Sequence, residues 1–159
     1  MLKWMLLLAA ALAGSAAAAP AWARVTWVAS PSQPPHALEA GWEKGGPLFL
    51  CQAHYGNAVY PGKVINGNRC NVGYGGAEYR VETFRWAVGR GDWASPGQGA
   101  RPVIGGYENG APLFVCKAHY IDAAGVDRGW HPGKIINGRC NITWGGAELP
   151  QQVYLQLFQ

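Results

Sequence analysis

The sequence predicts an all-β protein in which two tandem antiparallel β repeats pack with pseudo-twofold symmetry into one small domain. Three observations support this prediction. The 159 residues include 23 Gly and 11 Pro, which interrupt helices. Aromatic residues make up 12% of the chain and charged residues only 14%, a balance that excludes a charge-rich disordered tail. The third observation is an internal duplication that spans most of the chain.

The first 23 residues have the pattern of a cleaved signal peptide. Lys3 gives a positively charged start, an apolar stretch of ten residues follows, and an Ala-x-Ala sequence ends at Ala23. We expect cleavage after Ala23, which would place a chain beginning at Arg24 in the periplasm or outside the cell. The alternative is an uncleaved membrane anchor, since no charge occurs from Trp4 to Ala23. The mostly Ala composition and Pro20 favour cleavage, and we expect no stable membrane insertion.

The chain after the leader contains two copies of one repeat. The segment from Gly41 to Tyr55, GWEKGGPLFLCQAHY, matches without a gap the segment from Gly106 to Tyr120, GYENGAPLFVCKAHY. Pro-Gly-Lys, Asn-Gly and Gly-Gly-Ala-Glu then recur in both copies. The second copy has about six extra residues near Ile121–Trp130, which predict a longer surface loop. We assign residues 24–90 to the first repeat and residues 91–159 to the second.

Each copy predicts short strands separated by turns. Pro47–His54 and Pro112–His119 are apolar runs with aromatic and β-branched residues, which is typical of strands. A Lys-x-Ile run then ends in Asn-Gly, a hairpin signal because both residues accept a positive φ. Thr83–Val88 and Val153–Phe158 close the copies with the alternation of half-buried strands. Because a half of roughly 65 residues has only a marginal core of its own, we expect the halves to pack together.

Four cysteines predict disulfides, because an even number of cysteines in an exported chain is usually paired. Three pairings exist. The symmetry of the repeat favours Cys51–Cys70 with Cys116–Cys140, and a pairing across the repeats is the alternative. Cys-x-x-Cys does not occur and the histidines lack the spacing of metal ligands, so we expect no metal site and no cofactor.

The repeated residues resemble the DM-nine repeat family. The resemblance rests on Gly-x-Glu-x-Gly-x-Pro-Leu-Phe, followed by Pro-Gly-Lys and by Gly-Gly-Ala-Glu, and it covers Ala29 to about Phe158. Tandem copies of this repeat form small mannose-binding lectins of invertebrate immunity and the lectin-like module of natterin-type toxins. The resemblance therefore implies mannose-type carbohydrate binding. The chain departs from the family by its cysteines, which are not general there.

The resemblance also implies where the ligand binds. In the characterised lectins an acidic residue near the start of the repeat and the lysine of Pro-Gly-Lys contact mannose. These positions correspond to two equivalent sites, Glu43 with Lys63 and Glu108 with Lys134, although the sugar-binding members carry Asp in place of Glu. Four aromatic residues close in sequence could stack on a sugar ring: Trp42, Tyr60, Tyr107 and Trp130. The alternative is that each Glu–Lys pair is an exposed ion pair that braces two loops.

We expect an exported lectin-like protein whose partners are glycans or glycoconjugates, bound in a multivalent way. The basic residues are scattered singly, whereas a nucleic-acid site would need them clustered. We expect no enzyme activity, because no catalytic motif occurs and duplicated sites suit binding better than catalysis between unlike groups. Two alternatives stay open. One is a glycan-acting hydrolase that uses paired glutamates, and the other is a structural or interaction protein of the cell envelope with no small ligand.

Overall fold

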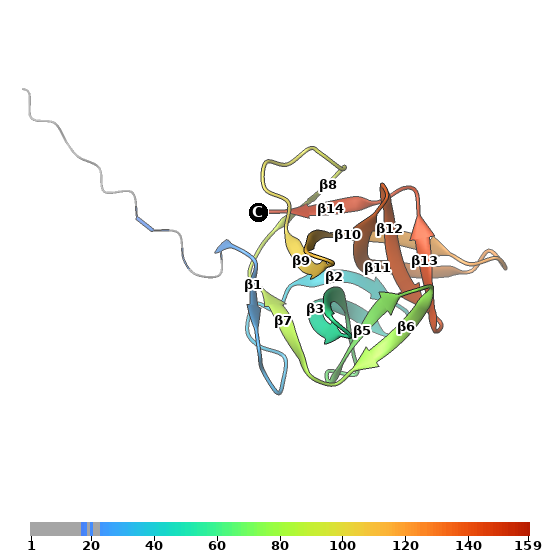
Figure 1. Ribbon diagram of the computed structural model, residues 1–159, viewed down its shortest axis with the longest axis horizontal. Helices are drawn as coiled ribbons and strands as arrows, with labels where there is room; N and C mark the ends of the chain where they lie inside the picture. The colour runs from blue at the N-terminus through green and yellow to red at the C-terminus, as the bar shows by residue number, and fades with distance from the viewer. Residues whose placement is uncertain (1–16, 19, 21–22) are drawn as a thin grey trace, which may run out of the picture.

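The computed structural model describes residues 17–18, 20 and 23–159. The expected signal peptide therefore lies almost wholly outside the described residues. In the part that is described, strands account for most of the chain (Figure 1). No helix there is long and apolar enough to cross a membrane.

The strands fall into two matching sets of seven. We call β1–β7 the first half and β8–β14 the second half. The first half contains β1 (Thr26–Val28), β2 (Glu39–Glu43), β3 (Gly46–Tyr55), β4 (Ala58–Ile65), β5 (Arg69–Tyr74), β6 (Ala77–Val81) and β7 (Phe84–Val88). The second half contains β8 (Asp92–Ala94), β9 (Ile104–Glu108), β10 (Ala111–Ile121), β11 (Asp127–Ile136), β12 (Arg139–Trp144), β13 (Ala147–Gln151) and β14 (Leu155–Phe158). The predicted all-β class is confirmed.

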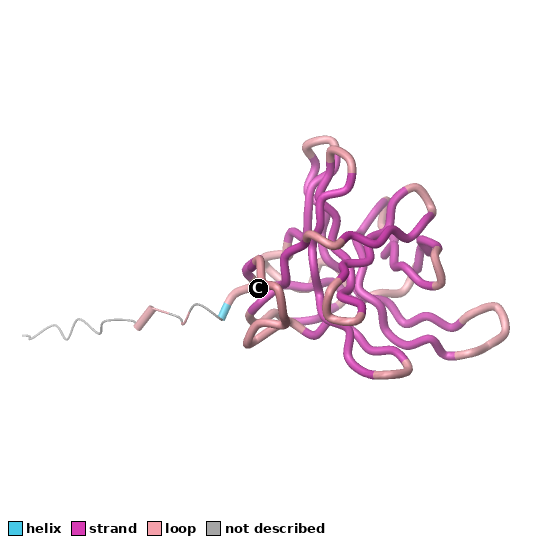
Figure 2. The backbone as a smooth tube through the Cα atoms, turned by 90° about the horizontal axis from the view of Figure 1, so that it is seen from below, coloured by secondary structure: helices cyan, strands magenta, loops and turns pink. Residues whose placement is uncertain are grey.

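The strands form one antiparallel sheet that closes on itself. Their order is β1-β7-β3-β2-β11-β12-β13-β6-β5-β4-β9-β10-β14-β8, with additional pairings of β3 with β4 and of β11 with β10. These pairings join β2, β3, β4, β9, β10 and β11 into a closed ring of strands that mixes both halves. Hairpins extend from this body, and their loops lie at its periphery (Figure 2).

The two halves pair strands with each other across a pseudo-twofold axis. β2 of the first half pairs with β11 of the second at Trp42 and Trp130. In the same way β9 of the second half pairs with β4 of the first at Tyr107 and Val59. Each pairing repeats the other with the halves reversed, which confirms the predicted pseudo-twofold packing.

Glycine at the start of each repeat motif makes these crossings possible. A Cβ atom on Gly41 would lie 2.0 Å from the carbonyl oxygen of Trp130, and a Cβ on Gly106 would lie 1.9 Å from that of Val59. No side chain fits at such a distance, so any other residue would push the halves apart. The repeat therefore begins with glycine because the backbones of the two halves touch there.

One of the apolar clusters of the core is shared by both halves. It brings Leu50 of the first half together with Val115 and Leu157 of the second, and these three side chains are fully buried. Because this cluster draws on both halves, neither half retains its complete core when it is separated from the other.

The predicted disulfides are confirmed. Cys51 is bonded to Cys70 and Cys116 to Cys140, and the described residues contain no free cysteine. Each bond links two strands that flank a third, β3 and β5 around β4 in the first half and β10 and β12 around β11 in the second. Both disulfides lie inside one half, so no covalent link other than the backbone joins the halves.

A candidate binding site between the two halves

The lysines of both Pro-Gly-Lys sequences are buried and reach into the opposite half. Lys63 is 3% exposed, and its Nζ donates a hydrogen bond of 2.6 Å to the carbonyl oxygen of Thr143. Lys134 is 4% exposed, and its Nζ donates a hydrogen bond of 2.6 Å to the carbonyl oxygen of Gly73. Because β4 and β11 carry these lysines toward the pseudo-twofold axis, each ammonium group binds the other half of the protein.

The glutamates of Gly-Gly-Ala-Glu neutralise these lysines. The Nζ of Lys63 lies 3.7 Å from the carboxylate of Glu78, and the Nζ of Lys134 lies 3.2 Å from that of Glu148. Burial lowers the pKa of Lys63, while the nearby charges of Glu78 and Glu43 favour its protonated form. These ion pairs are buried. The alternative prediction, in which each lysine forms an exposed ion pair that braces two loops, therefore does not describe Lys63 or Lys134.

The residue before each Pro-Gly-Lys differs between the halves. In the first half it is Tyr60, whose ring centroid lies 4.1 Å from the Nζ of Lys134. In the second half it is His131, whose Nδ1 lies 3.0 Å from the Nζ of Lys63. Since an ammonium group can only donate, Nδ1 accepts, and Nε2–H donates to the carbonyl oxygen of Arg128 at 2.7 Å. Burial and the charge of Lys63 lower the pKa of His131 to about 4, so this ring is neutral at pH 7.

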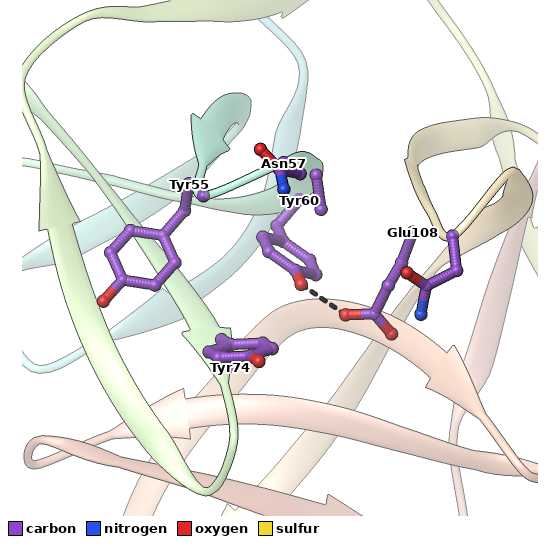
Figure 3. A pocket seen from close by; sticks show the side chains of 8 residues that line it. Tyr55, Asn57, Tyr60, Tyr74 and Glu108 are labelled. Atoms are coloured by element: carbon purple, nitrogen blue, oxygen red, sulfur yellow. Dashed lines mark hydrogen bonds between the residues drawn. The ribbon is translucent and has the colours of Figure 1, made fainter.

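A cavity of about 530 Å³ opens where the β3–β4 hairpin of the first half meets the β9–β10 turn of the second (Figure 3). Ring centroids of Tyr55 and Tyr60 lie 5.9 and 5.8 Å from that of Tyr74. The hydroxyl of Tyr60 donates a hydrogen bond to the carboxylate of Glu108, and burial together with this bond raises the pKa of Tyr60. The aromatic and polar side chains that line the cavity are Tyr55, Asn57, Tyr60, Tyr74, Glu108 and Asn109.

The second half repeats the aromatic part of this arrangement. Tyr120 and Trp144 stand where the first half has Tyr55 and Tyr74, and their ring centroids lie 5.7 Å apart. Glu43 stands at the position of Glu108 in the repeat.

In the second half, however, a cation covers the aromatic surface. The guanidinium of Arg128 lies 4.6 Å from the ring centroid of Trp144. It forms an ion pair of 2.7 Å with Asp122, which belongs to the extra residues of the second repeat. Arg128 and Asn57 both stand four residues before the proline of Pro-Gly-Lys, so the two halves place different side chains at one position.

The structure distributes the residues predicted from the sequence over several places. Tyr60 and Glu108 line the cavity, and Lys134 lies against the ring of Tyr60. Tyr107 is 51% exposed on the neighbouring strand surface. The other two predicted aromatic residues, Trp42 and Trp130, line a smaller cavity of about 290 Å³. Lys117 and Trp93 line the same cavity.

Sequence reasoning missed Tyr55, Tyr74 and Asn57 as site residues. The signal that could have found the two tyrosines is the repetition of an aromatic residue at both positions in the second copy. Tyr74 is 46% exposed, which sets it apart from a residue of the core. Asn57 has no such signal, because Arg128 stands at its position in the other copy.

Comparison with known proteins supports the resemblance stated from the repeat. Residues 19–81 match the family model of the DM9 repeat. The matched range contains the hairpin that bears Asn57 and Tyr60, and it ends after Tyr74. No curated protein gave a significant match to the chain.

Proposed function

We propose that this chain, whose residues 19–81 match the DM9 repeat, binds a mannose-type sugar in the cavity beside Tyr60 and does not chemically change it. The observation that supports the proposal is the cavity itself, which offers three tyrosines, two asparagines and one glutamate around about 530 Å³. Such a volume is within the usual range of small-molecule sites. The resemblance adds support, because the characterised tandem lectins of this family bind mannose.

The lining residues have the chemistry that a pyranose requires. The carboxylate of Glu108 can accept hydrogen bonds from two neighbouring hydroxyls, and the amides of Asn57 and Asn109 can both donate and accept. The half-exposed ring of Tyr74 offers an apolar face to the C–H groups of the sugar. Tyr60 holds Glu108 in place through its hydroxyl.

Lys134 has a positioning role in this proposal. Its ammonium group is engaged by the carbonyl oxygen of Gly73 and by Glu148, and it packs against the ring of Tyr60. It therefore supports the residue that orients Glu108. In the second half Arg128 covers the corresponding aromatic surface, so we propose one open site per chain rather than two equivalent ones.

Calorimetry with methyl α-mannoside tests this proposal. We expect one site per chain with a Kd around millimolar, which corresponds to about −4 kcal/mol. Such weakness is normal, because the sugar exchanges hydrogen bonds with water for hydrogen bonds with the protein. Glu108→Gln and Tyr74→Ala should each weaken binding about tenfold or more, whereas the exposed Glu82→Gln should not. Two sites of equal affinity would contradict the single open site, and released reducing ends from an oligosaccharide would favour a hydrolase.

Export is part of the proposal. Two buried disulfides are compatible with an oxidising compartment. Sequencing of the N-terminus after expression in a host that exports proteins should give a chain that starts at Arg24. A chain that keeps Met1 in the membrane fraction would favour the anchor instead.

A further inference from the structure

We infer that the sugar recognised beside Tyr60 carries a free amine, so that the preferred ligand is an amino sugar rather than a neutral hexose. This inference rests on the proposed function, because it takes the cavity to be a sugar site. It adds the chemical class of the sugar, which the family resemblance does not give.

The second half shows which group this aromatic surface accepts. There the guanidinium of Arg128 lies over Trp144, which stands at the position of Tyr74 in the repeat. A cation over an aromatic ring is attracted by the negative face of the ring. Arg128 thus occupies in the second half the place that a bound cation would occupy in the first. We call it the internal analogue of such a ligand.

The extra loop of the second repeat is built to hold this cation. Asp122 accepts backbone hydrogen bonds from Ala124 and Val126 at 2.9 Å through one oxygen. Its other oxygen accepts a hydrogen bond of 2.8 Å from Nε of Arg128. The guanidinium is therefore fixed between a carboxylate and a ring. A carboxylate and a ring also line the cavity of the first half, Glu108 and Tyr74, although Asp122 belongs to the extra loop and is not the repeat counterpart of Glu108.

The first half lacks this loop and leaves its cavity without a cation from the chain. Ala58 comes three positions after Tyr55 in the sequence. The equivalent residue of the second half, Gly129, comes nine positions after Tyr120. At the position of Arg128 stands Asn57, a short neutral side chain that lines the cavity. The aromatic surface of the first half is therefore left to a ligand from outside the chain.

The charge balance of the cavity favours a positive ligand. Among the described residues that line it, Glu108 is the one acidic side chain, and no Lys or Arg is present. The nearby Lys134 is neutralised by Glu148 at 3.2 Å and binds the carbonyl oxygen of Gly73. In the described part of the chain, the carboxylate of Glu108 accepts one side-chain hydrogen bond. Its donor is the neutral hydroxyl of Tyr60. An ammonium group would add charge to both contacts, as an ion pair with Glu108 and as a cation over the ring of Tyr74, whereas a hydroxyl or an acetylated amine brings no charge to either.

The test compares three sugars that differ in one substituent and one cation that is not a sugar. Glucosamine, glucose and N-acetylglucosamine are titrated into the full mature chain at pH 6, where the free amine is protonated, and arginine amide is titrated separately. We expect glucosamine to bind at least tenfold more tightly than glucose or N-acetylglucosamine. This preference should shrink as salt is added, because it depends on charge. Glu108→Gln should abolish the preference, whereas Glu82→Gln should retain it.

A second variant tests the internal analogue directly. Arg128→Asn removes the cation from Trp144 and gives the second half the residue that the first half has. We expect the number of glucosamine sites per chain to rise from one to two. A folded Arg128→Asn variant that still has one site would overturn the equivalence on which the inference depends.

The outcomes separate this inference from the proposed function. Equal binding of all three sugars would overturn the preference for an amine and leave the sugar site standing. Binding of none of the three sugars would overturn the amino sugar, and the further failure of methyl α-mannoside to bind would overturn the sugar site as well. Binding of arginine amide alone would assign the cavity to basic side chains of a protein or peptide and would overturn the amino sugar.

Discussion

The ammonium group of Lys63 in the first half of the chain donates a hydrogen bond of 2.6 Å to the carbonyl oxygen of Thr143 in the second half. Lys134 and Gly73 form the same bond in the opposite direction. A buried charge is stable only when it is paired and hydrogen-bonded. Each half therefore supplies a carbonyl acceptor to the buried lysine of the other half, whereas the carboxylate that pairs with the lysine, Glu78 or Glu148, comes from its own half.

Removal of the Lys63 ammonium should destabilise the protein strongly. Lys63→Ala leaves the carboxylate of Glu78 and the carbonyl of Thr143 buried without their partner. We expect the free energy of unfolding in urea to fall by about 3–5 kcal/mol. Arg80→Ala, at an exposed position, should change it by less than about 0.5 kcal/mol. A loss below about 1 kcal/mol for Lys63→Ala would mean that the ammonium is not held in this place.

Stability should fall as the pH decreases from about 6.5 to 4, because of His131. Its pKa is about 4 in the folded chain and about 6.5 in the unfolded chain, so the unfolded chain binds more protons in this range. The contribution of His131 is fully present above pH 6.5 and is lost progressively toward pH 4, by about 3 kcal/mol in total. Urea denaturation at several pH values measures it.

His131→Tyr is the matched control for this pH dependence. Tyrosine is the residue that the first half has at the same position, Tyr60, and it does not titrate in this range. The difference in the free energy of unfolding between the two proteins should therefore vary with pH below 6.5. Parallel pH curves would show that His131 is protonated as easily in the folded chain as in the unfolded one.

Gly106→Ala should separate the strands that join the halves. Its Cβ would lie 1.9 Å from the carbonyl oxygen of Val59, so β9 and β4 would have to move apart. We expect a loss of at least about 2 kcal/mol in the free energy of unfolding. The exposed neighbour on the same strand provides the comparison, and Tyr107→Ala should cost clearly less. Equal effects of the two substitutions would mean that the close approach of the backbones is not what requires glycine.

Neither half should fold alone. Residues 24–90 contain β2 and β4, whose partners β11 and β9 lie in the other half, and the shared cluster around Leu50 also needs residues of both. We expect an unfolded circular dichroism spectrum for each oxidised fragment, 24–90 or 91–159, and recovery of the strand signal when the two are mixed. A dispersed NMR spectrum from monomeric 24–90 would contradict this expectation.

The sequence predicted the parts of the fold that depend on local signals and on the duplication. The Asn-Gly turns at Asn66 and Asn137 have the expected positive φ, and the disulfides follow the symmetry of the repeat. The hydrogen-bond partners of Lys63 and Lys134 could not be predicted from the sequence. Lys63 and Thr143 are 80 positions apart, and only the pairing of strands between the halves brings them together.

The candidate site was predicted only in part, because it too depends on contacts between the two halves. Repeated residues suggested two equivalent sites within the copies, whereas the open cavity combines Tyr60 of one copy with Glu108 of the other. The difference between the halves comes from the extra loop, whose effect depends on where Arg128 points. Spacing alone cannot give that direction, because it is set by the ion pair with Asp122 and the ring of Trp144.

The order of the disulfides along the chain bears on how the protein matures. Each bond joins two cysteines that are consecutive in the sequence, first Cys51 with Cys70 and then Cys116 with Cys140. A chain that is translocated N-terminus first presents the cysteines to an oxidase in this order. Under the proposed export, pairing on arrival would yield the native set, and we expect maturation to need an oxidase but no isomerase to reshuffle mispaired bonds.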